Sequence, residues 1–400
     1  MTGGVSSRRR GSMLPCAIAV LVAILSACGD SAGTHGAGGP RIVSTSTASA
    51  CVATATSNFQ AGMAPMEIRP LGPFDTSSSQ GKTFAIVQFA REGNAVEVAS
   101  AKALADALAN VGAKLIVFDG KGRPDVLLQA FESAIAQNVA GIVADGFDMD
   151  LVKTGVAAAK TANIPVLDVG ASSTTPVEPP GVAAYVAVDA TRVGALQANY
   201  ALAHTNCKLH TVTMPVSGGS IPSNMAKGAE AAINKLCPTD CSIEQLEVNP
   251  ATFISDLAGQ VKTTLQRSPD LNYWITTTDF FTPFILQGMR AVDRQLPIVG
   301  GAQGDGLINA IKGTNGLVAI TLWPPAEITG YIYADGIMRA VAGVPQNQVT
   351  PVQLVDSSNW GTSADVKERF PQLDSWREAF KVAWRVKDDR RRGSPGGGAR

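Results

Sequence analysis

Two carboxylates follow apolar runs within residues 141–170, where a strand, a helix and a second strand are expected in turn. Asp145 ends the run at 142–144, and Asp168 lies in the run that Pro165 opens. Apolar side chains between them recur at helical spacing, so the two runs are predicted to be parallel strands joined by a helix. Ligands of such sheets bind beyond the carboxyl ends of the strands. Both carboxylates are therefore candidates for hydrogen bonding to a small ligand.

Groups suited to catalysis or metal binding are scarce. The chain lacks the motifs H-E-x-x-H and G-x-x-x-x-G-K-[ST], and its three histidines have spacings that fit no catalytic triad. The glycine-rich stretch 300–304 follows a predicted strand but lacks the dinucleotide fingerprint. Cys237 and Cys241 have the spacing of half a metal site, but no histidine lies near them at ligand spacing. The sequence thus predicts no enzyme, no cofactor and no metal.

The elements that position these side chains alternate regularly between strand and helix. Strands are expected first at 84–89 and 115–118, and Asn94 with Glu97 three residues later is a capping signature for the helix between them. After a Pro-rich bridge at 175–181 the alternation resumes. Further strands are expected at 185–188, 209–214, 243–248, 273–277, 297–300, 317–322 and 352–355. The pattern predicts two doubly wound α/β lobes, each with a parallel sheet between helices.

The first 27 residues have the three segments of an export signal. Arginines at 8–10 precede an apolar run at 17–25, and small residues then precede Cys28. A cysteine in this position resembles a bacterial lipoprotein box, in which the signal is removed ahead of the cysteine and the cysteine carries lipid. An ordinary signal peptide with a coincidental cysteine is the alternative. We therefore expect a signal peptide over 1–27 and an extracytoplasmic protein, lipid-anchored at Cys28 to the cell membrane.

Composition limits the remaining possibilities. The chain has 33 basic and 33 acidic residues, so no excess charge attracts it to nucleic acid or acidic lipid. Its 400 residues, 45% of them hydrophobic, suffice for two domains with sizeable cores. Residues 28–81 are rich in Gly, Ser, Thr, Ala and Pro and are predicted to be a flexible tether, and the Arg/Gly tail at 388–400 is predicted to be disordered.

Cys16 is removed with the signal and Cys28 is the proposed lipid site, so four of the six cysteines remain. In an oxidising compartment they are disulfide candidates: Cys51, Cys207, Cys237 and Cys241. Four cysteines allow three pairings. A bond among the last three is expected, but the sequence leaves the partners open.

In the order of its elements, the stretch 82–359 resembles the type I periplasmic sugar-binding proteins, the ribose-binding-like family that serves ABC importers. The stretches that carry the resemblance are 112–119, 162–166, Val188-Asp189 with Gly194, Thr278-Asp279, and a long helix from Gly330 to Gly343. Such proteins consist of two similar lobes joined by a three-crossing hinge, and they close on a ligand in the cleft. The resemblance implies the same architecture here.

The implied lobe boundaries follow from where the crossings are expected. The chain is expected to cross near 175–182, near 323–325 and near 344–350. These positions imply an N-terminal lobe over 82–181 plus 324–346, and a C-terminal lobe over 182–323 plus 347–387.

The resemblance implies polar ligand contacts at Asn94, Asp145, Thr278 and Asp279. Asn94 is equally interpretable as a helix cap, and Asp145 as a solvated turn carboxylate. Sugar binders usually carry an Asp-Arg pair where this chain has Gly170-Ala171, and an Asp where it has Ala302 followed by Gln303. Fewer charged groups that grip hydroxyls are therefore expected, and a less polar ligand is compatible with the sequence.

Aromatic residues stand near strand ends that face the expected cleft, among them Phe281. Their rings are suited to stacking on a sugar face or enclosing an apolar ligand, and the alternative is packing between the lobes. The complete set of expected ligand-binding residues is Phe89, Asn94, Asp145, Phe147, Ser223, Thr278, Asp279, Phe280, Gln303 and Trp323.

The function implied by the resemblance is that of a monomeric solute-binding protein. It would close on a sugar or a less polar sugar-like molecule and deliver it to the permease of an ABC importer. The alternative is a lipoprotein sensor that presents its ligand state to a membrane receptor or kinase. No nucleic-acid partner is expected, because an export signal occupies the place of the DNA-binding helices in the LacI-type repressors that share this fold.

Overall fold

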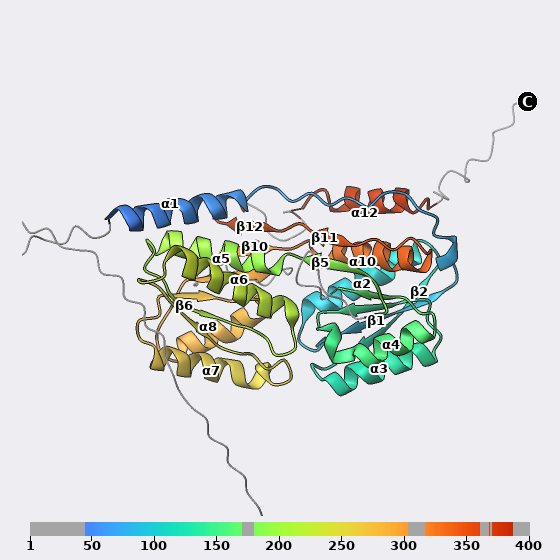
Figure 1. Cartoon of the computed structure of the whole chain (residues 1–400), viewed down its shortest axis with the longest axis horizontal. Coiled ribbons are helices and arrows are strands. Elements are labelled where there is room, and N and C mark those ends of the chain that lie inside the picture. The colour runs from blue at the N-terminus through green and yellow to red at the C-terminus, as the bar shows by residue number, and fades with distance from the viewer. Residues whose placement is uncertain (1–44, 170–179, 303–316, 361–367, 369, 387–400) are drawn as a thin grey trace, which may run out of the picture. The chain divides into compact units, whose positions relative to one another are not determined.

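The computed structural model describes residues 45–169, 180–302, 317–360, 368 and 370–386, which contain two six-stranded sheets (Figure 1). The first sheet has the strand order β11-β5-β4-β3-β1-β2, and all its neighbouring strands are parallel. Its strands are β1 (Thr83–Gln88), β2 (Lys114–Asp119), β3 (Ile142–Asp145), β4 (Val166–Asp168), β5 (Val182–Val188) and β11 (Gln348–Thr350).

The second sheet repeats the design in the order β12-β10-β9-β8-β6-β7. Its neighbours are parallel except for β12, which runs antiparallel to β10. Its strands are β6 (His210–Thr213), β7 (Ser242–Gln245), β8 (Tyr273–Ile275), β9 (Ile298–Ala302), β10 (Leu317–Leu322) and β12 (Gln353–Asp356). The two doubly wound α/β lobes predicted from the sequence are confirmed.

Helices cover both faces of each sheet (Figure 1). In the first lobe α2 packs against α10 and α3 against α4, and in the second lobe α5 packs against α6 and α7 against α8. The helices are α1 (Thr45–Ala61), α2 (Ala95–Ala109), α3 (Pro124–Ala136), α4 (Lys153–Thr161), α5 (Ala190–His204), α6 (Ser220–Leu236), α7 (Phe253–Arg267), α8 (Thr282–Arg290), α10 (Ala326–Val341) and α12 (Leu373–Ala383), with short 3₁₀ turns at Ser77–Ser79, Met149–Val152 and Asp279–Phe281. The central strands β1 and β3 are buried almost throughout, as expected for parallel strands covered on both sides.

Two glycines noted in the resemblance lie where helices approach each other closely. A Cβ at Gly330 of α10 would lie 2.2 Å from the backbone nitrogen of Leu104 on α2. A Cβ at Gly194 of α5 would lie 1.8 Å from the carbonyl oxygen of Met225 on α6. These distances are too short for any side chain, so glycine permits the helix spacing of both lobes.

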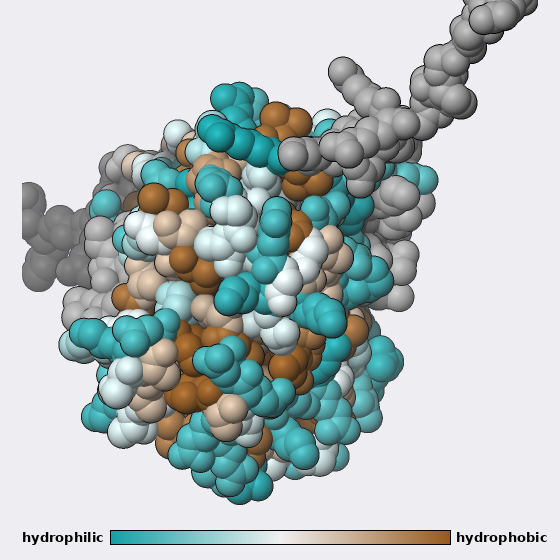
Figure 2. Space-filling view, turned by 90° about the vertical axis from the view of Figure 1, so that its right-hand side faces the viewer, coloured by the Kyte–Doolittle hydropathy of each residue, from teal (hydrophilic) through white to brown (hydrophobic). Residues whose placement is uncertain are grey.

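The edge strand β2 carries an exposed apolar side chain at Val117. Figure 2 views the end of the molecule where this strand lies, and apolar patches appear there among polar residues. Val117 is 40% exposed, and the strand begins at Lys114 and ends at Asp119. Charges at the two ends of an edge strand disfavour pairing with a second sheet.

Three crossings between the lobes directly follow strands, and they can be compared with the positions expected from the sequence. The crossings follow β5, β10 and β11, at residues 189, 323–325 and 351–352. The expected crossing at 323–325 is confirmed. The crossing expected near 175–182 is wrong, because β5 pairs with β4 and so lies in the first sheet. The crossing expected near 344–350 begins just after that range, because β11 pairs with β5 in the first sheet.

The flexible tether expected over 28–81 is wrong for its described part, because Thr45–Ala61 form helix α1. Cys51, Ala55 and Phe59 are buried at intervals of four residues, so they share one face. This face packs against α5, where the Phe59 ring lies 5.1 Å from that of Tyr200. The signal peptide expected over 1–27, the tether residues up to 44 and the tail expected over 388–400 lie outside the described residues.

After α1 the chain passes from the second lobe to the first along an extended segment. Near its start, the carbonyl oxygen of Gly62 accepts a hydrogen bond of 2.8 Å from Leu354 N beside the second sheet. Near its end, Phe74 N donates 3.1 Å to the carbonyl oxygen of Ala383 in α12. This segment, residues 62–74, is a further connection between the lobes, and the passage from β12 to α12 is another.

Helix α12 belongs to the first lobe, which corrects the assignment of residues up to 387 to the second. It packs on α10, where Trp384 Nε1 donates 2.8 Å to the buried carboxylate of Asp335. The same carboxylate pairs with Arg339 at 2.8 Å. Stacking of Trp384 on Tyr331 at 5.8 Å completes this attachment. The lobe to which an amphipathic helix belongs is the one against which its apolar face packs, and the apolar face of α12 packs against α10 of the first lobe.

Two disulfides are present, Cys51–Cys207 and Cys237–Cys241. The expected bond among the last three cysteines is confirmed, and Cys51 takes the remaining partner. The first bond joins α1 to the residues just ahead of β6, and the second closes a short loop ahead of β7. Among the described helices, none is both long and apolar enough to cross a membrane.

Candidate ligand-binding site

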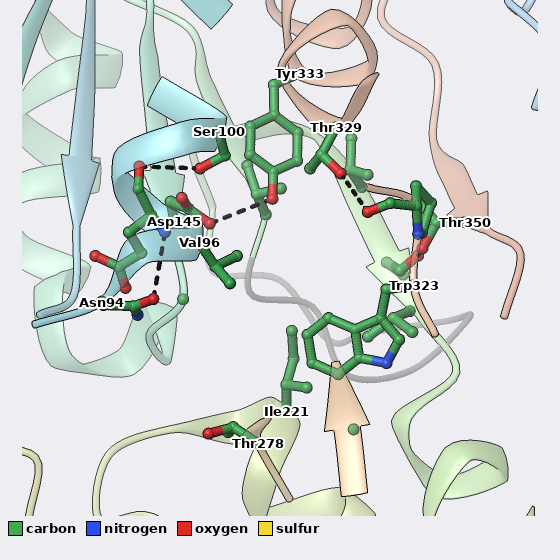
Figure 3. Close-up of a pocket in the computed structure, with 18 of the residues that line it drawn as sticks. Asn94, Val96, Ser100, Asp145, Ile221, Thr278, Trp323, Thr329, Tyr333 and Thr350 are labelled. Atoms are coloured by element: carbon green, nitrogen blue, oxygen red, sulfur yellow. Dashed lines mark hydrogen bonds between the residues drawn. The ribbon is translucent and has the colours of Figure 1, made fainter. Parts of the chain in front are cut away.

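A cavity of about 130 Å³ lies at the carboxyl ends of the strands and is lined by both lobes (Figure 3). We call it the polar chamber. The first lobe contributes the start of α2, the end of β3 and α10, and the second lobe contributes the start of α6 and the residues after β8. The crossing at 323–325 contributes Trp323 and Pro324, and the strand ends just before the other two crossings contribute Val188 and Thr350. A ligand here would touch every part that must move when the lobes open.

Two carboxyl groups, those of Glu97 and Asp145, face this chamber from the first lobe. Asp145 Oδ2 accepts a hydrogen bond of 3.1 Å from Gln88 Nε2, and Oδ1 accepts one of 3.4 Å from the Tyr333 hydroxyl (Figure 3). The Gln88 amide also donates 2.7 Å to the carbonyl oxygen of Glu97, so one side chain of β1 positions both acidic residues.

Burial changes the ionisation of this pair. Burial raises the pKa of Asp145 from 3.8 to about 6, against the lowering effect of its Gln88 and Tyr333 hydrogen bonds. Burial, followed by the nearby Asp145 charge, raises the pKa of Glu97 well above its usual 4.5, although Arg91 acts in the opposite direction. Both carboxyl groups of the chamber therefore keep their protons to a higher pH than exposed carboxyl groups do.

Three buried polar atoms on the chamber wall find no hydrogen-bond partner among the described residues. They are Glu97 Oε2, Thr278 Oγ1 and the indole nitrogen of Trp323. A buried polar atom without a partner costs about 1–3 kcal/mol. One atom comes from each lobe and one from the crossing at 323–325, so each of these parts offers a hydrogen bond to a polar ligand.

A second cavity of about 120 Å³ adjoins the first, and we call it the aromatic chamber. It shares part of its wall with the polar chamber, including Glu97, Ile221, Thr278 and Trp323. Its remaining lining is Phe89, Ala90, Val216, Gly219, Pro222, Pro250, Phe253 and Phe281.

The structure brings together most of the expected site residues that it describes. The residues of the expected set that line the polar chamber are Asn94, Asp145, Thr278, Phe280 and Trp323, and Phe89 lines the aromatic chamber. Asn94 also caps α2, since its Oδ1 accepts from Glu97 N at 3.3 Å, so both of its interpretations fit this position.

The other expected residues lie elsewhere or cannot be placed. Phe147 is fully buried in the first lobe. The Ser223 hydroxyl donates a hydrogen bond of 3.1 Å to the carbonyl oxygen of Val216. Neither residue is among those that line the two chambers. Phe147 is the second residue after Asp145, and its side chain enters the core instead. Gln303, Gly170-Ala171 and the side chain of Asp279 lie outside what the structure describes.

Sequence reasoning missed Glu97 and Tyr333. Glu97 was assigned only as the partner of a helix cap, and its burial at 9% exposure is what sets it apart. Tyr333 lies on α10, far along the chain from the strands it faces, and only the packing of α10 on the first sheet brings it to Asp145.

Comparison with known proteins decides the family. Residues 86–343 match the family described as periplasmic binding protein domain. The chain belongs to this family. Its members are extracytoplasmic solute-binding proteins and not enzymes, in agreement with the sequence analysis. No match to a curated protein was found.

Solved structures share the type I fold of this periplasmic binding protein. An ABC transporter solute-binding protein from Mycobacterium smegmatis with bound glycerol is 21% identical, with a TM-score of 0.63 over 71% of this chain and 98% of that one. A carbohydrate transporter protein from Acidothermus cellulolyticus 11B in complex with myo-inositol is 16% identical, with a TM-score of 0.61 over 75% of this chain and 99% of that one. At these identities the likeness establishes the fold.

Proposed function

We propose that this protein is a lipid-anchored solute-binding protein that closes its lobes on one small molecule and delivers it to an ABC permease. The observation that carries the proposal is the polar chamber, which is lined by both lobes and by the crossing at 323–325. A ligand that contacts both lobes stabilises the closed form by its higher affinity for that form. Closure then converts the presence of a solute into a shape that a membrane partner recognises.

The ligand that fits the chamber is a sugar or a less polar sugar-like molecule. Hydroxyl groups can donate to the Asp145 carboxylate and accept from the Trp323 indole nitrogen and the Thr278 hydroxyl. The Trp323 ring offers a face on which a sugar ring stacks, and the Pro324 that follows restricts its backbone. The polyols bound to the two similar structures support this ligand class, although each belongs to its own protein.

Calorimetry on a Trp323→Ala variant tests the proposal. The ligand is first identified by native mass spectrometry of the purified mature protein, because tight binders of this shape often keep it. Burying an aromatic ring against a ligand contributes about 1–3 kcal/mol, so the variant should bind about tenfold to a hundredfold more weakly. Trp323→Phe is the matched control, which keeps a ring but removes the N–H, and should lose less. Undiminished affinity in Trp323→Ala, or equal X-ray scattering dimensions with and without saturating ligand, would refute the closing site.

A further inference from the structure

The two chambers adjoin at a shared wall, so a ligand that lies along this wall would reach both. Ile221, Thr278, Phe280 and Trp323 line both chambers from the second lobe and the crossing, and Glu97 lines both from the first lobe. All three of the buried polar atoms without partners belong to this shared wall. Their hydrogen bonds would therefore hold the middle of a ligand that extends to either side.

The two sides differ sharply in chemistry. The polar chamber includes the hydroxyls of Ser100, Thr329, Tyr333 and Thr350 together with the Asp145 carboxyl group. Every residue that lines the aromatic chamber alone is apolar. A fully hydroxylated sugar would leave its hydroxyl groups without hydrogen-bond partners in the aromatic chamber. Each hydroxyl group buried in this way weakens the free energy of binding.

The aromatic chamber also lies on the side away from the crossings. Of the crossing residues, only Trp323 reaches it, and it is bordered instead by Pro250 and the start of α7. On that side the lobes meet, since a Cβ at Gly122 of the first lobe would lie 3.2 Å from Pro250 of the second. A ligand would thus place its polar end toward the crossings and its apolar end toward the outer edge of the cleft.

The aromatic wall is held in place by contacts within the second lobe. The Phe253 ring lies 5.5 Å from both Phe280 and Phe281 and 5.6 Å from Phe284, all in edge-to-face arrangements. Phe89 lines the same chamber from the first lobe and is buried. If these rings served only to pack the lobes together, they would be expected to fill the space that they enclose, yet a cavity of about 120 Å³ remains.

We propose that the ligand is amphipathic, with a polyol-like head in the polar chamber and an aryl or similarly bulky apolar substituent in the aromatic chamber, as in an aryl glycoside. This inference rests on the proposed function, because it specifies the ligand class of the same site. Trp323 then lies at the junction, where its ring contacts both parts and its N–H is available to the linking oxygen.

Matched glycosides test the proposal by calorimetry. The probes are methyl and 4-nitrophenyl glycosides of glucose, galactose, mannose and arabinose, compared pairwise on the wild-type protein. For the sugar that binds, the nitrophenyl glycoside should bind about tenfold to a hundredfold more tightly than its methyl partner. Phe253→Leu keeps most of the side-chain volume but removes the ring, and should bring the ratio of the nitrophenyl affinity to the methyl affinity close to one. Phe284→Leu alters the same aromatic cluster outside the chamber lining, and should retain the ratio.

The outcomes separate this inference from the proposed function. Equal affinities for the methyl and nitrophenyl forms, or an undiminished ratio in a folded Phe253→Leu protein, overturn the amphipathic ligand while leaving a sugar-binding protein. Failure of every glycoside and free sugar to bind the folded wild-type protein overturns the proposed sugar-like ligand class, and this inference with it.

Discussion

Replacing Asp145 by asparagine should change stability in a way that depends on pH. The carboxyl group is 7% exposed, and burial raises its pKa from 3.8 to about 6. A carboxyl group with a raised pKa in the folded state holds its proton more tightly there than in the unfolded chain. Below pH 3.8 the carboxyl group is protonated in both states, so it does not change the free energy of unfolding. Above pH 6 it is ionised in both states, and the full cost of its ionisation in the folded protein lowers the free energy of unfolding.

The magnitude follows from the size of this change. Each pKa unit corresponds to about 1.4 kcal/mol, so ionised Asp145 costs the folded protein about 3 kcal/mol above pH 6. The amide of the Asp145→Asn variant carries no charge at either pH, and it can still pair with Gln88 and Tyr333. The stability of Asp145→Asn relative to wild type should therefore be about 2–3 kcal/mol more favourable at pH 8 than at pH 4.

Urea unfolding of the ligand-free protein at pH 4 and pH 8 measures this difference. Comparison between the two pH values removes any constant effect of the substitution on packing. Asp148→Asn, at an exposed carboxylate three residues later, is the control and should change by no more than about 0.5 kcal/mol between the two conditions. If Asp145→Asn shows the same relative stability at both pH values, the carboxyl group is well solvated and our reasoning about the chamber is wrong.

Three further predictions concern anchoring and the packing of the lobes. Cys28→Ser should release the protein from membranes or block its processing, and unchanged mass and membrane fractionation would contradict the lipid anchor. Replacing Cys51 and Cys207 together by alanine should lower the free energy of unfolding by about 2–5 kcal/mol, because their bond closes a long loop across a sequence separation of 156; an unshifted urea midpoint would argue against this. Gly330→Ala should destabilise the first lobe by about 1–3 kcal/mol through the clash with α2, while Gly259→Ala, at an open helical position, should stabilise by up to about 1 kcal/mol; thermal melts that reverse this order would disprove the close contact.

Much of the fold was predictable because parallel strands between helices have a strong sequence pattern. The lobe boundaries were not, since the strand expected at 185–188 fits either lobe and only its pairing with β4 assigns it. Strand β11 was not expected, because residues 344–350 were predicted to be a crossing. Helix α1 was missed because Thr45–Ala61 consists mostly of small and hydroxyl-bearing residues. Its burial depends on a disulfide whose partner the sequence could not identify.

The site was predictable only where it follows the strands. Asp145 was found because polar residues after parallel strands face the ligand edge of a sheet, and Thr278 was found from the family resemblance. Glu97 and Tyr333 reach the same cavity through the packing of α2 and α10, which leaves no local signal in the sequence. The rule for strand ends also fails two residues beyond Asp145, where Phe147 turns into the core.

The bond between Cys51 and Cys207 determines how a mechanical pull would travel through the protein. Any tension applied to the chain ahead of Cys51 passes through this bond into the second lobe. The first lobe, formed mostly by residues between the two cysteines, lies within the closed loop and is bypassed by the force. A protein held by its N-terminal end could therefore be pulled or crowded at the membrane while the first lobe remains free to open and close over the ligand.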